Sequence, residues 1–291
     1  MTSTAALRRD AGVLAGSLPP LLAHAERLAA TVVLGDHGRR RAGQGDEFWQ
    51  YRPAHEGDEA RHIDWRRSAR SDSHFIRQKE WQAAQSVLFW VDNGQSMSFA
   101  SGKALPQKGE RARVLALATA ALLLRGGERV GLLGHDAPPR AGEMQLAPLA
   151  EALMEGGDQT EYGAPAFSGL RSNARAVMIS DFLGDMAPIE TALTHAANKG
   201  IGGVLLQVLD PQEEAFPFDG RTIFESMGGS LRHETLKAGD LRSRYLQRLA
   251  DRKASLAELA RMTGWQISCH HTGDSASAAL LWLYRILEGA R

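Results

Sequence analysis

Residues 87–99 read VLFWVDNGQSMSF, an apolar run that ends abruptly in an acid, a glycine and two serines. The first five side chains show no alternation of polar and apolar residues, which is typical of a parallel strand covered on both faces. Such a strand delivers Asp92 to the carboxyl edge of a sheet, where the ligands of open α/β proteins gather. The stretch therefore predicts an α/β fold with a candidate site at Asp92.

The chain from residue 86 onward alternates short apolar runs with helical stretches. The expected strands lie at 87–92, 129–135, 176–181, 203–210 and 265–272, and the expected helices at 110–125, 146–154, 188–198, 241–262 and 275–291. Alternation of this kind requires right-handed crossovers between neighbouring strands. It predicts a doubly wound, mostly parallel sheet of about six strands, with residues 87–92 in a central position.

One segment interrupts this alternation. Two short β runs, 221–226 and 230–235, flank a Met-Gly-Gly sequence at residues 227–229, which is typical of a hairpin turn. We expect this hairpin at an edge of the sheet, within a main domain of residues 86–291.

Residues 1–85 form an N-terminal extension of a different character. A helix is predicted from about Pro19 to Leu34, because apolar residues recur on one face and a glycine follows. The long segment after it, rich in Gly, Arg, His and acids, is loop-like. Its many aromatic residues favour burial over disorder, so we expect residues 36–85 to pack onto the main domain with Trp65 as a buried anchor.

Composition excludes several classes of protein. A length of 291 residues with 43% hydrophobic residues allows one large α/β domain plus an extension. The 34 Lys and Arg residues equal the 34 Asp and Glu residues, so no global field attracts nucleic acid or an anionic membrane. The single cysteine, Cys269, excludes an internal disulfide and a cysteine-only metal cluster. No apolar window reaches the roughly 20 residues of a membrane span, and the first residues lack a secretory signal, which predicts a cytoplasmic protein without membrane insertion.

Four runs between residues 43 and 97 resemble the signature of a known family. The runs GQGDEF (43–48), YRPAHEGDEARHIDWRRSAR (51–70), FIRQKEW (75–81) and VDNGQSM (91–97) follow one another in that order. This order resembles the bacterial domain-of-unknown-function family fifty-eight, in which such a signature precedes a von Willebrand factor A-like domain. The resemblance extends from Gly35 to the C-terminus, and it implies a non-catalytic or uncharacterised role beside a MoxR-type AAA+ ATPase. The sequence departs from the signature where HEGD replaces Pro-Gly-Asp.

Charged residues of the GDEARHIDWRRSAR run recur at helical spacing. Arg61, Asp64, Arg67 and Arg70 are each three residues apart, so opposite charges can meet. One interpretation is an internal ion-pair network that fixes the segment. The other is a surface of bidentate Arg groups that binds the carboxylates of a partner protein, which makes these four residues candidates for partner binding.

The spacing of Asp92 and Ser96 resembles the metal-ion-dependent adhesion site of von Willebrand factor A domains, whose pattern is D-x-S-x-S. Gly94 stands in place of the first serine, so one hydroxyl ligand is missing. By the same resemblance, Thr160 matches the second loop of that site, and Asp181 closes the strand 176–181. These oxygens predict a weak Mg²⁺ site with places left for a partner's carboxylate. In the alternative interpretation, the two Asp residues only cap loops and helices. A Gly94→Ser change is expected to tighten the cation if the backbone there has negative φ.

Two classes of function remain open. The first is a non-enzymatic interaction module that presents the carboxyl edge of the sheet to the ATPase or to its client. The second is a metal-dependent hydrolase in which Asp92 and Asp181 hold a cation that activates water, but no general base is evident. Neither a G-x-S-x-G elbow nor a phosphate-binding loop occurs. His270 and His271 have no acid at ligand spacing, which favours a satisfied or surface pair over a zinc site.

Overall fold

The computed structural model of the chain describes residues 21–32, 39–43, 47–55, 58–59, 63–69, 74–155, 160–165 and 174–289. The contacts divide the chain into two compact units. The larger unit comprises Met1–Gly35 and Gln85–Ala290, and the smaller unit comprises Asp36–Ala84. The extension predicted at residues 1–85 is therefore two parts, and its first part belongs to the unit that holds the main sheet.

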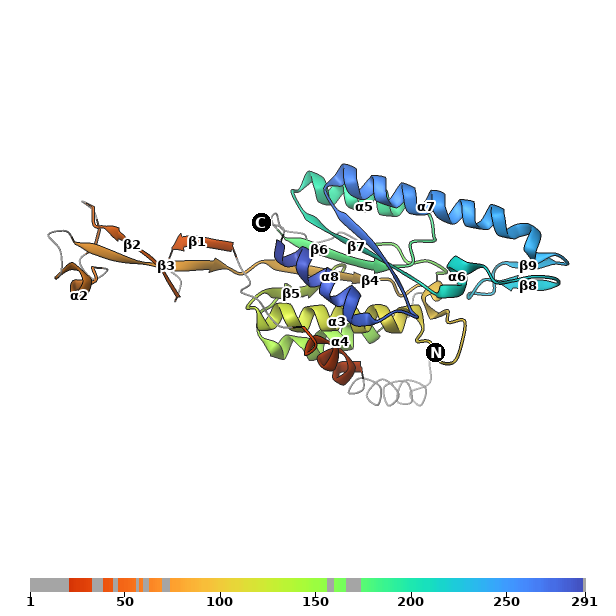
Figure 1. Cartoon of the computed structure of the whole chain (residues 1–291), viewed down its shortest axis with the longest axis horizontal. Helices are drawn as coiled ribbons and strands as arrows, with labels where there is room; N and C mark the ends of the chain where they lie inside the picture. Colours follow the sequence, from red (N-terminus) through yellow and green to blue (C-terminus); the bar gives the residue numbers. More distant parts are fainter. Residues whose placement is uncertain are drawn as a thin grey trace. The chain divides into compact units, whose positions relative to one another are not determined.

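The larger unit is built on a parallel sheet (Figure 1). Its five strands are β4 (Ser86–Val91), β5 (Arg129–Leu132), β6 (Arg175–Ser180), β7 (Gly202–Leu209) and β10 (Gln266–His271), in the order β10-β7-β6-β4-β5. The predicted α/β class and the parallel pairing are confirmed. The predicted strand at 87–92 is internal, because β4 pairs with β6 on one side and with β5 on the other, although β6 is the middle strand. The five strands observed among the described residues are one fewer than the approximate six expected.

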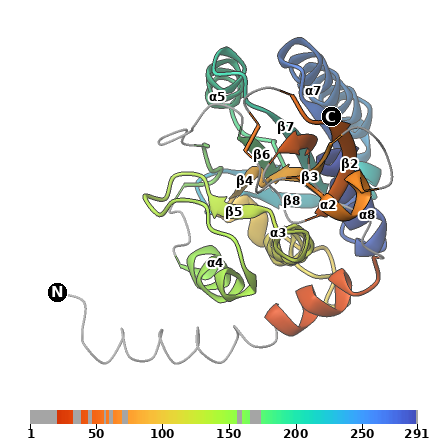
Figure 2. The same cartoon turned by 90° about the vertical axis from the view of Figure 1, so that its left-hand side faces the viewer.

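Helices cover both faces of this sheet (Figure 2). They are α3 (Lys108–Arg125), α4 (Leu146–Met154), α5 (Ala187–Asn198), α7 (Arg242–Thr263) and α8 (Ala276–Gly289), with a short α6 (Pro211–Ala215) after β7. Because successive strand side chains point to opposite faces, β4 contributes to two cores. Val87, Phe89 and Val91 pack in the core that contains α3, α4 and α8, and Leu88 packs in the core that contains α5 and α7. The sheet is doubly wound, as the sequence predicts.

The N-terminal helix completes the first of these cores. Residues 21–29 are helical. Leu21, Ala25, Leu28 and Ala29 are buried with the side chains of α3 and α4, which confirms the predicted apolar face. The chain turns at residues 30–31, so the helix ends earlier than predicted, while Pro19 and residues 33–38 lie outside the described residues.

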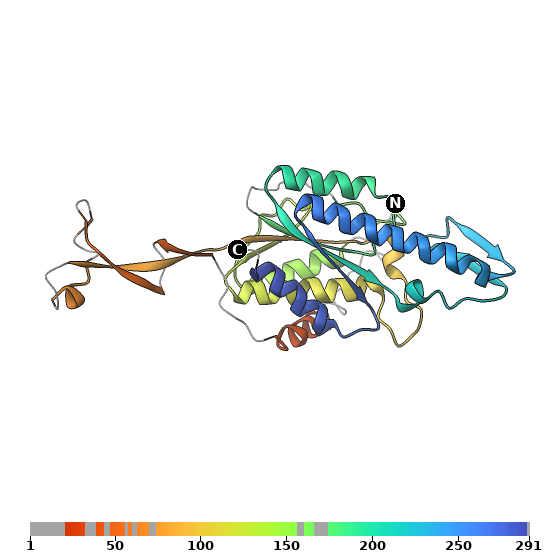
Figure 3. The same ribbon diagram turned by 45° about the horizontal axis from the view of Figure 1, so that its top comes forward.

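The predicted hairpin exists but does not extend the main sheet. β8 (Thr222–Glu225) and β9 (Arg232–Thr235) form an antiparallel sheet of their own, next to the start of α7 (Figure 3). The rings of Phe216 and Phe224 stack at 5.6 Å, and Tyr245 of α7 lies 4.8 Å from Phe216. Aromatic packing thus holds the hairpin, so the expectation of an edge position in the sheet was wrong.

The smaller unit is a three-stranded antiparallel sheet rather than the predicted loop. β1 (Arg39–Gly43) and β2 (Glu47–Pro53) pair with the two sides of β3 (Phe75–Ala83), and a short α2 (Trp65–Ser68) lies between β2 and β3. Trp65 is 58% exposed, with its ring 5.5 Å from that of His74. The prediction of a buried Trp65 was therefore wrong. Packing of this unit onto the main domain stays a prediction.

None of the described helices combines the length and the apolar character that crossing a membrane requires.

Candidate functional site

The carboxyl edge of the main sheet carries a buried acid at its β4 end. Asp92 follows β4 directly and is 1% exposed. Its Oδ1 accepts hydrogen bonds from the backbone N–H groups of Gly94 at 2.7 Å and Gly163 at 3.0 Å, and its Oδ2 accepts one from Ser180 Oγ at 2.6 Å. Burial raises the pKa of the Asp92 carboxyl, although these three donors favour the charged form. Asp92 thus joins its own loop to the loop of Gly163 and to the end of β6.

A buried lysine lies against the second predicted acid. Asp181 follows β6 and is fully buried, and Lys108, the first residue of α3, is 1% exposed. Lys108 Nζ donates to Asp181 Oδ2 at 2.9 Å and to Glu213 Oε1 of α6 at 2.6 Å. Asp181 Oδ1 also accepts the backbone N–H of Leu183. Burial alone lowers the pKa of Lys108, but the charges of Asp181 and Glu213 outweigh it, and the pKa is raised. The ammonium is therefore a permanent cation within the protein at this edge.

The two predicted hydroxyl ligands lie on the neighbouring loops. Ser96 is buried, and its Oγ has no hydrogen-bond partner among the described residues. Thr160 Oγ1 donates to the carbonyl of Tyr162 at 3.0 Å. The loops themselves are joined, because the backbone N–H of Gln95 donates to the carbonyl of Thr160 and that of Ser96 to the carbonyl of Glu161. The loop that carries Asp92 and Ser96 thus contacts the loop that carries Thr160. Whether these residues hold a metal ion stays a prediction.

Gly94 explains why the adhesion pattern is incomplete. Its φ of −58° is ordinary for any residue, so the backbone condition for a serine is met. However, a Cβ on Gly94 would lie 2.7 Å from Gly163 N and 2.9 Å from Glu161 O, both of which are backbone atoms. A serine at this position therefore meets the φ condition but needs a shift of the facing loop, and whether it tightens a cation stays a prediction.

The turn of the β8–β9 hairpin is attached to the same edge. The Glu161 carboxylate accepts the backbone N–H groups of Met227 at 3.0 Å and Gly228 at 2.7 Å. A Cβ on Gly228 would lie 2.3 Å from Gln95 Oε1, which shows how closely the turn approaches the loop after β4. Large apolar side chains are exposed on and just after the hairpin, namely Ile223, Met227, Leu231 and Leu236 at 45%, 46%, 72% and 73%. Their exposure makes these side chains available for contact with another protein.

The predicted partner-binding residues are only partly described. Arg61 and Arg70 lie outside the described residues. Asp64 caps α2, because its Oδ1 accepts the backbone N–H of Arg67 at 3.0 Å, and its Oδ2 accepts the hydroxyl of Tyr51 at 3.1 Å. The Arg67 guanidinium lies 4.6 Å from the Tyr51 ring centroid. These contacts favour a structural role for Asp64 and Arg67, and their binding of a partner stays a prediction.

Two residues of this site were missed in the sequence. Lys108 and Glu213 lie in stretches without a recognisable motif, and their pairing joins segments more than a hundred residues apart. The sequence holds no signal that singles out Lys108, because Glu110, Arg111 and Arg113 are also charged residues in the first turns of α3 and none of them is among its buried residues.

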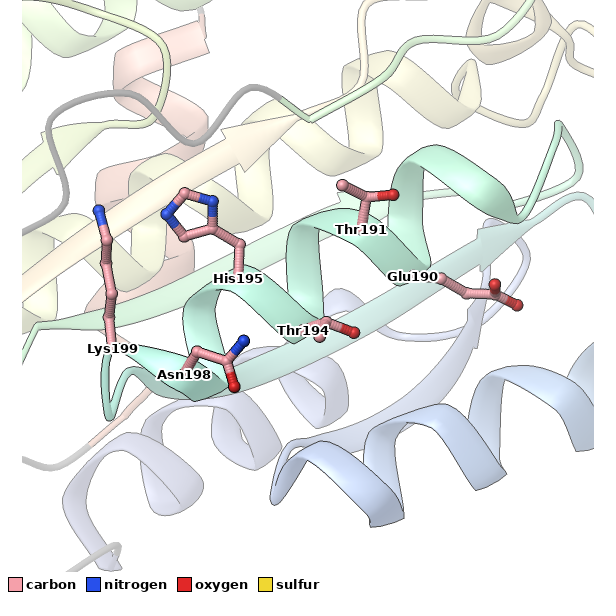
Figure 4. Close-up of a pocket in the computed structure, with 6 residues that line it drawn as sticks. All are labelled: Glu190, Thr191, Thr194, His195, Asn198 and Lys199. Atoms are coloured by element: carbon pink, nitrogen blue, oxygen red, sulfur yellow. The ribbon is translucent and has the colours of Figure 1, made fainter.

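A surface pocket of about 620 Å³ lies on the exposed face of α5, away from the residues described above (Figure 4). Its lining consists of Glu190, Thr191, Thr194, His195, Asn198 and Lys199. Five of them come from α5 and Lys199 follows its last residue, and the six side chains do not converge on a common point as the groups of a catalytic site would.

Comparisons with known proteins agree with the resemblance read from the sequence. The model of a family described as "Protein of unknown function DUF58" matches residues 50–255. Uncharacterized protein Rv1480 of Mycobacterium tuberculosis (strain ATCC 25618 / H37Rv) is 28% identical over 247 residues, which are 80% of this chain and 77% of that protein. Uncharacterized protein Mb1516 of Mycobacterium bovis matches with the same identity and the same coverage.

Two solved structures are also similar. One is an aerotolerance-related membrane protein from Bacteroides fragilis NCTC 9343, with a TM-score of 0.40 and 14% identity, covering 71% of this chain and 100% of that chain. The other is the conserved hypothetical protein BatB from Bacteroides thetaiotaomicron, with a TM-score of 0.38 and 15% identity over the same shares.

Proposed function

The chain belongs to the DUF58 family of proteins of unknown function, and we propose that it is a non-enzymatic protein–protein interaction module. In this proposal the large unit has a von Willebrand factor A-like architecture, and the carboxyl edge of its sheet, with the attached hairpin, contacts the partner. The partner is a MoxR-type AAA+ ATPase, which the family resemblance implies, and the complex acts in the assembly or maturation of a client protein. A cytoplasmic location is part of the same proposal.

The observation that carries this proposal is the Lys108 ammonium between Asp181 and Glu213. A cation that the protein itself supplies neutralises Asp181, which in an adhesion site would hold a metal ion. Because Asp92 also has three protein donors, the edge is rigid without an added ion. A rigid, pre-organised edge beside exposed apolar side chains is suited to binding another protein.

The same contacts weigh against the metal-dependent hydrolase. Such an enzyme needs carboxylate oxygens that are free to hold the cation and a general base that reaches water. Here Asp92 and Asp181 both accept hydrogen bonds from groups of the protein.

Binding to the ATPase tests the proposal. A MoxR-type AAA+ ATPase from the same genome is immobilised with Mg²⁺ and ATP present in every experiment, and the full chain is passed over it. We expect Leu231→Ser to weaken binding at least about tenfold, because a central apolar side chain contributes more than about 1.4 kcal/mol at an interface. Met144→Ser is the matched control, since Met144 is 91% exposed on another part of the unit. Absence of binding by the wild-type chain, or equal binding by both variants, would contradict the proposal.

A further inference from the structure

Three potential metal ligands meet at the carboxyl end of the outer strand β10, where Glu214 of α6 follows Glu213 of the Lys108 site. The carboxylate of Glu214, the thiol of Cys269 and the imidazole of His271 each place a ligand atom within 4.8 Å of the other two. Cys269 Sγ lies 4.0 Å from His271 Nε2, and the same ring nitrogen contacts the Glu214 carboxylate. The cluster joins the end of the sheet to α6.

The fold explains why these side chains converge. Cys269 and His271 are two residues apart on β10, so both point to the same side of the strand. His270 points to the other side, where its Nε2 lies 2.9 Å from a guanidinium nitrogen of Arg111. Glu214 is presented by α6, whose start is fixed by a capping box between Asp210 and Glu213. The acid that is absent at ligand spacing in the sequence thus comes from a helix 57 residues away.

We propose that Glu214, Cys269 and His271 bind a divalent transition metal ion, with Zn²⁺ as the best match. A set of one sulfur, one nitrogen and one oxygen suits zinc, whereas Mg²⁺ and Ca²⁺ select oxygen alone. Tetrahedral bonds to zinc place neighbouring ligand atoms about 3.3 to 3.8 Å apart. The 4.0 Å between sulfur and nitrogen needs only a small adjustment of two side chains to reach that spacing.

A second observation supports the metal ion. The other ring nitrogen of His271, Nδ1, lies 3.4 Å from Asp274 Oδ2. A carboxylate on the far side of the imidazole is the usual outer partner of a metal-bound histidine, because it holds the proton on Nδ1 and turns the lone pair of Nε2 toward the metal. His271 Nε2 contacts the Glu214 carboxylate on the opposite side of the ring. A metal ion bound by both groups would lie at this contact.

The site is accessible to an ion from solvent. The side chains of His271 and Glu214 are 29% and 39% exposed. Lys253 of α7 also pairs with Glu214. A lysine head on a flexible four-carbon stem can leave toward solvent when a metal ion arrives. The three protein ligands leave the fourth place of a tetrahedral ion for water or for a group of a partner protein.

The single cysteine of the chain makes this proposal directly testable. The full chain, freed of metal with a chelator, is titrated with Co²⁺ and, in competition with a chromophoric chelator, with Zn²⁺. Thiolate ligation to Co²⁺ produces a charge-transfer absorption in the near ultraviolet, and in this protein only Cys269 can cause it. We expect that absorption at one ion per chain, independent of protein concentration, and its loss in Cys269→Ser.

Matched variants assign the other ligands. His271→Gln and Glu214→Gln are expected to weaken Zn²⁺ binding at least about tenfold, and Asp274→Asn about 10- to 100-fold as an outer partner. His195→Gln and Glu190→Gln, on the exposed face of α5, are controls that leave binding unchanged. Melting curves of the metal-free variants establish that each is folded. A missing charge-transfer absorption, one ion shared by two chains, or unchanged Zn²⁺ binding in both His271→Gln and Glu214→Gln would overturn the proposal.

Discussion

Replacing Lys108 with Met tests whether the buried ammonium stabilises the carboxyl edge. Met nearly keeps the volume of the lysine stem, so the cavity contribution is small. The substitution removes the cation from Asp181 and Glu213, which are 2.9 and 2.6 Å from it, while Asp181 stays fully buried and Glu213 partly buried. Removing one partner of a buried ion pair costs about 3 to 5 kcal/mol, and we expect a loss of unfolding free energy in that range at pH 7.

The loss should depend on pH in a defined direction. Burial raises the pKa of Glu213 above its ordinary value, and Lys108 opposes that rise. Without Lys108 the folded-state pKa of Glu213 rises further above the unfolded value, so the folded variant binds a proton more tightly than the unfolded chain does. A raised pKa stabilises the folded variant at pH values below the pKa that Glu213 has in the unfolded chain. This stabilisation is lost as the pH rises through the pKa that Glu213 has in the folded variant. The difference between wild type and variant is therefore larger at pH 8 than at pH 5.

Urea unfolding at pH 5, 7 and 8 measures both effects. Lys103→Met is the control, because Lys103 is exposed and its loss should change stability by no more than about 0.5 kcal/mol. A Lys108→Met variant within about 1 kcal/mol of wild type at pH 7 would refute the reasoning, because a buried pair is expected to cost more. The reasoning would also be refuted if the difference in unfolding free energy between wild type and Lys108→Met were not smaller at pH 5 than at pH 8.

Three further substitutions test the packing around this edge. Gly94→Ala should cost about 1 to 3 kcal/mol in urea unfolding, because its Cβ meets backbone atoms of the facing loop, whereas Gly102→Ala, with open space around it, should be close to neutral. Glu161→Ala removes the acceptor of two hairpin amides, so hydrogen exchange of those amides should rise about fivefold or more, as a net loss of ~1 kcal/mol implies; unchanged exchange would mean that the turn is held by other contacts. Trp265→Ala should cost about 3 to 5 kcal/mol because Trp265 is 4% exposed. Trp65→Ala, at a site 58% exposed, should cost about 0.5 kcal/mol, and equal losses for the two tryptophans would contradict this assignment.

The large unit was predictable because its signal is local. The runs around β6 and β7 are short and mostly apolar, and the helices between the strands have apolar faces, so each element could be placed from its own residues. The bounds of α4, Leu146–Met154, agree with those predicted. The internal position of β4 was predicted, but the full strand order was not, because it depends on where each crossover connection leads.

The small unit was read as a loop for a physical reason. β3 runs FIRQKEWQA, in which apolar and charged residues do not alternate, so the period of a half-buried strand is absent. The signal that remained was the density of aromatic residues, which indicates order but not the kind of order. Trp65 shows the limit of that inference, since an aromatic residue in a structured segment can still lie on its surface.

The residues of the candidate site were also predicted only in part. Asp92 and Asp181 were found because each follows an apolar strand directly. Lys108 and Glu213 were missed because only the tertiary fold brings them together. The two predicted hydroxyl ligands, Ser96 and Thr160, lie on loops that contact each other. Their spacing in the sequence does not predict where each side chain points, and the Thr160 hydroxyl points toward the Tyr162 carbonyl.

Calorimetric titration of the full chain with Mg²⁺ tests most directly whether the Lys108 ammonium takes the place of a metal ion at the carboxyl edge. The Asp181→Ala variant, titrated in parallel, separates this edge from any other cation site. The account predicts no saturable heat for the wild-type chain at millimolar Mg²⁺. A one-site isotherm in the wild type that disappears in Asp181→Ala would contradict it, and would place a metal ion where we place the lysine.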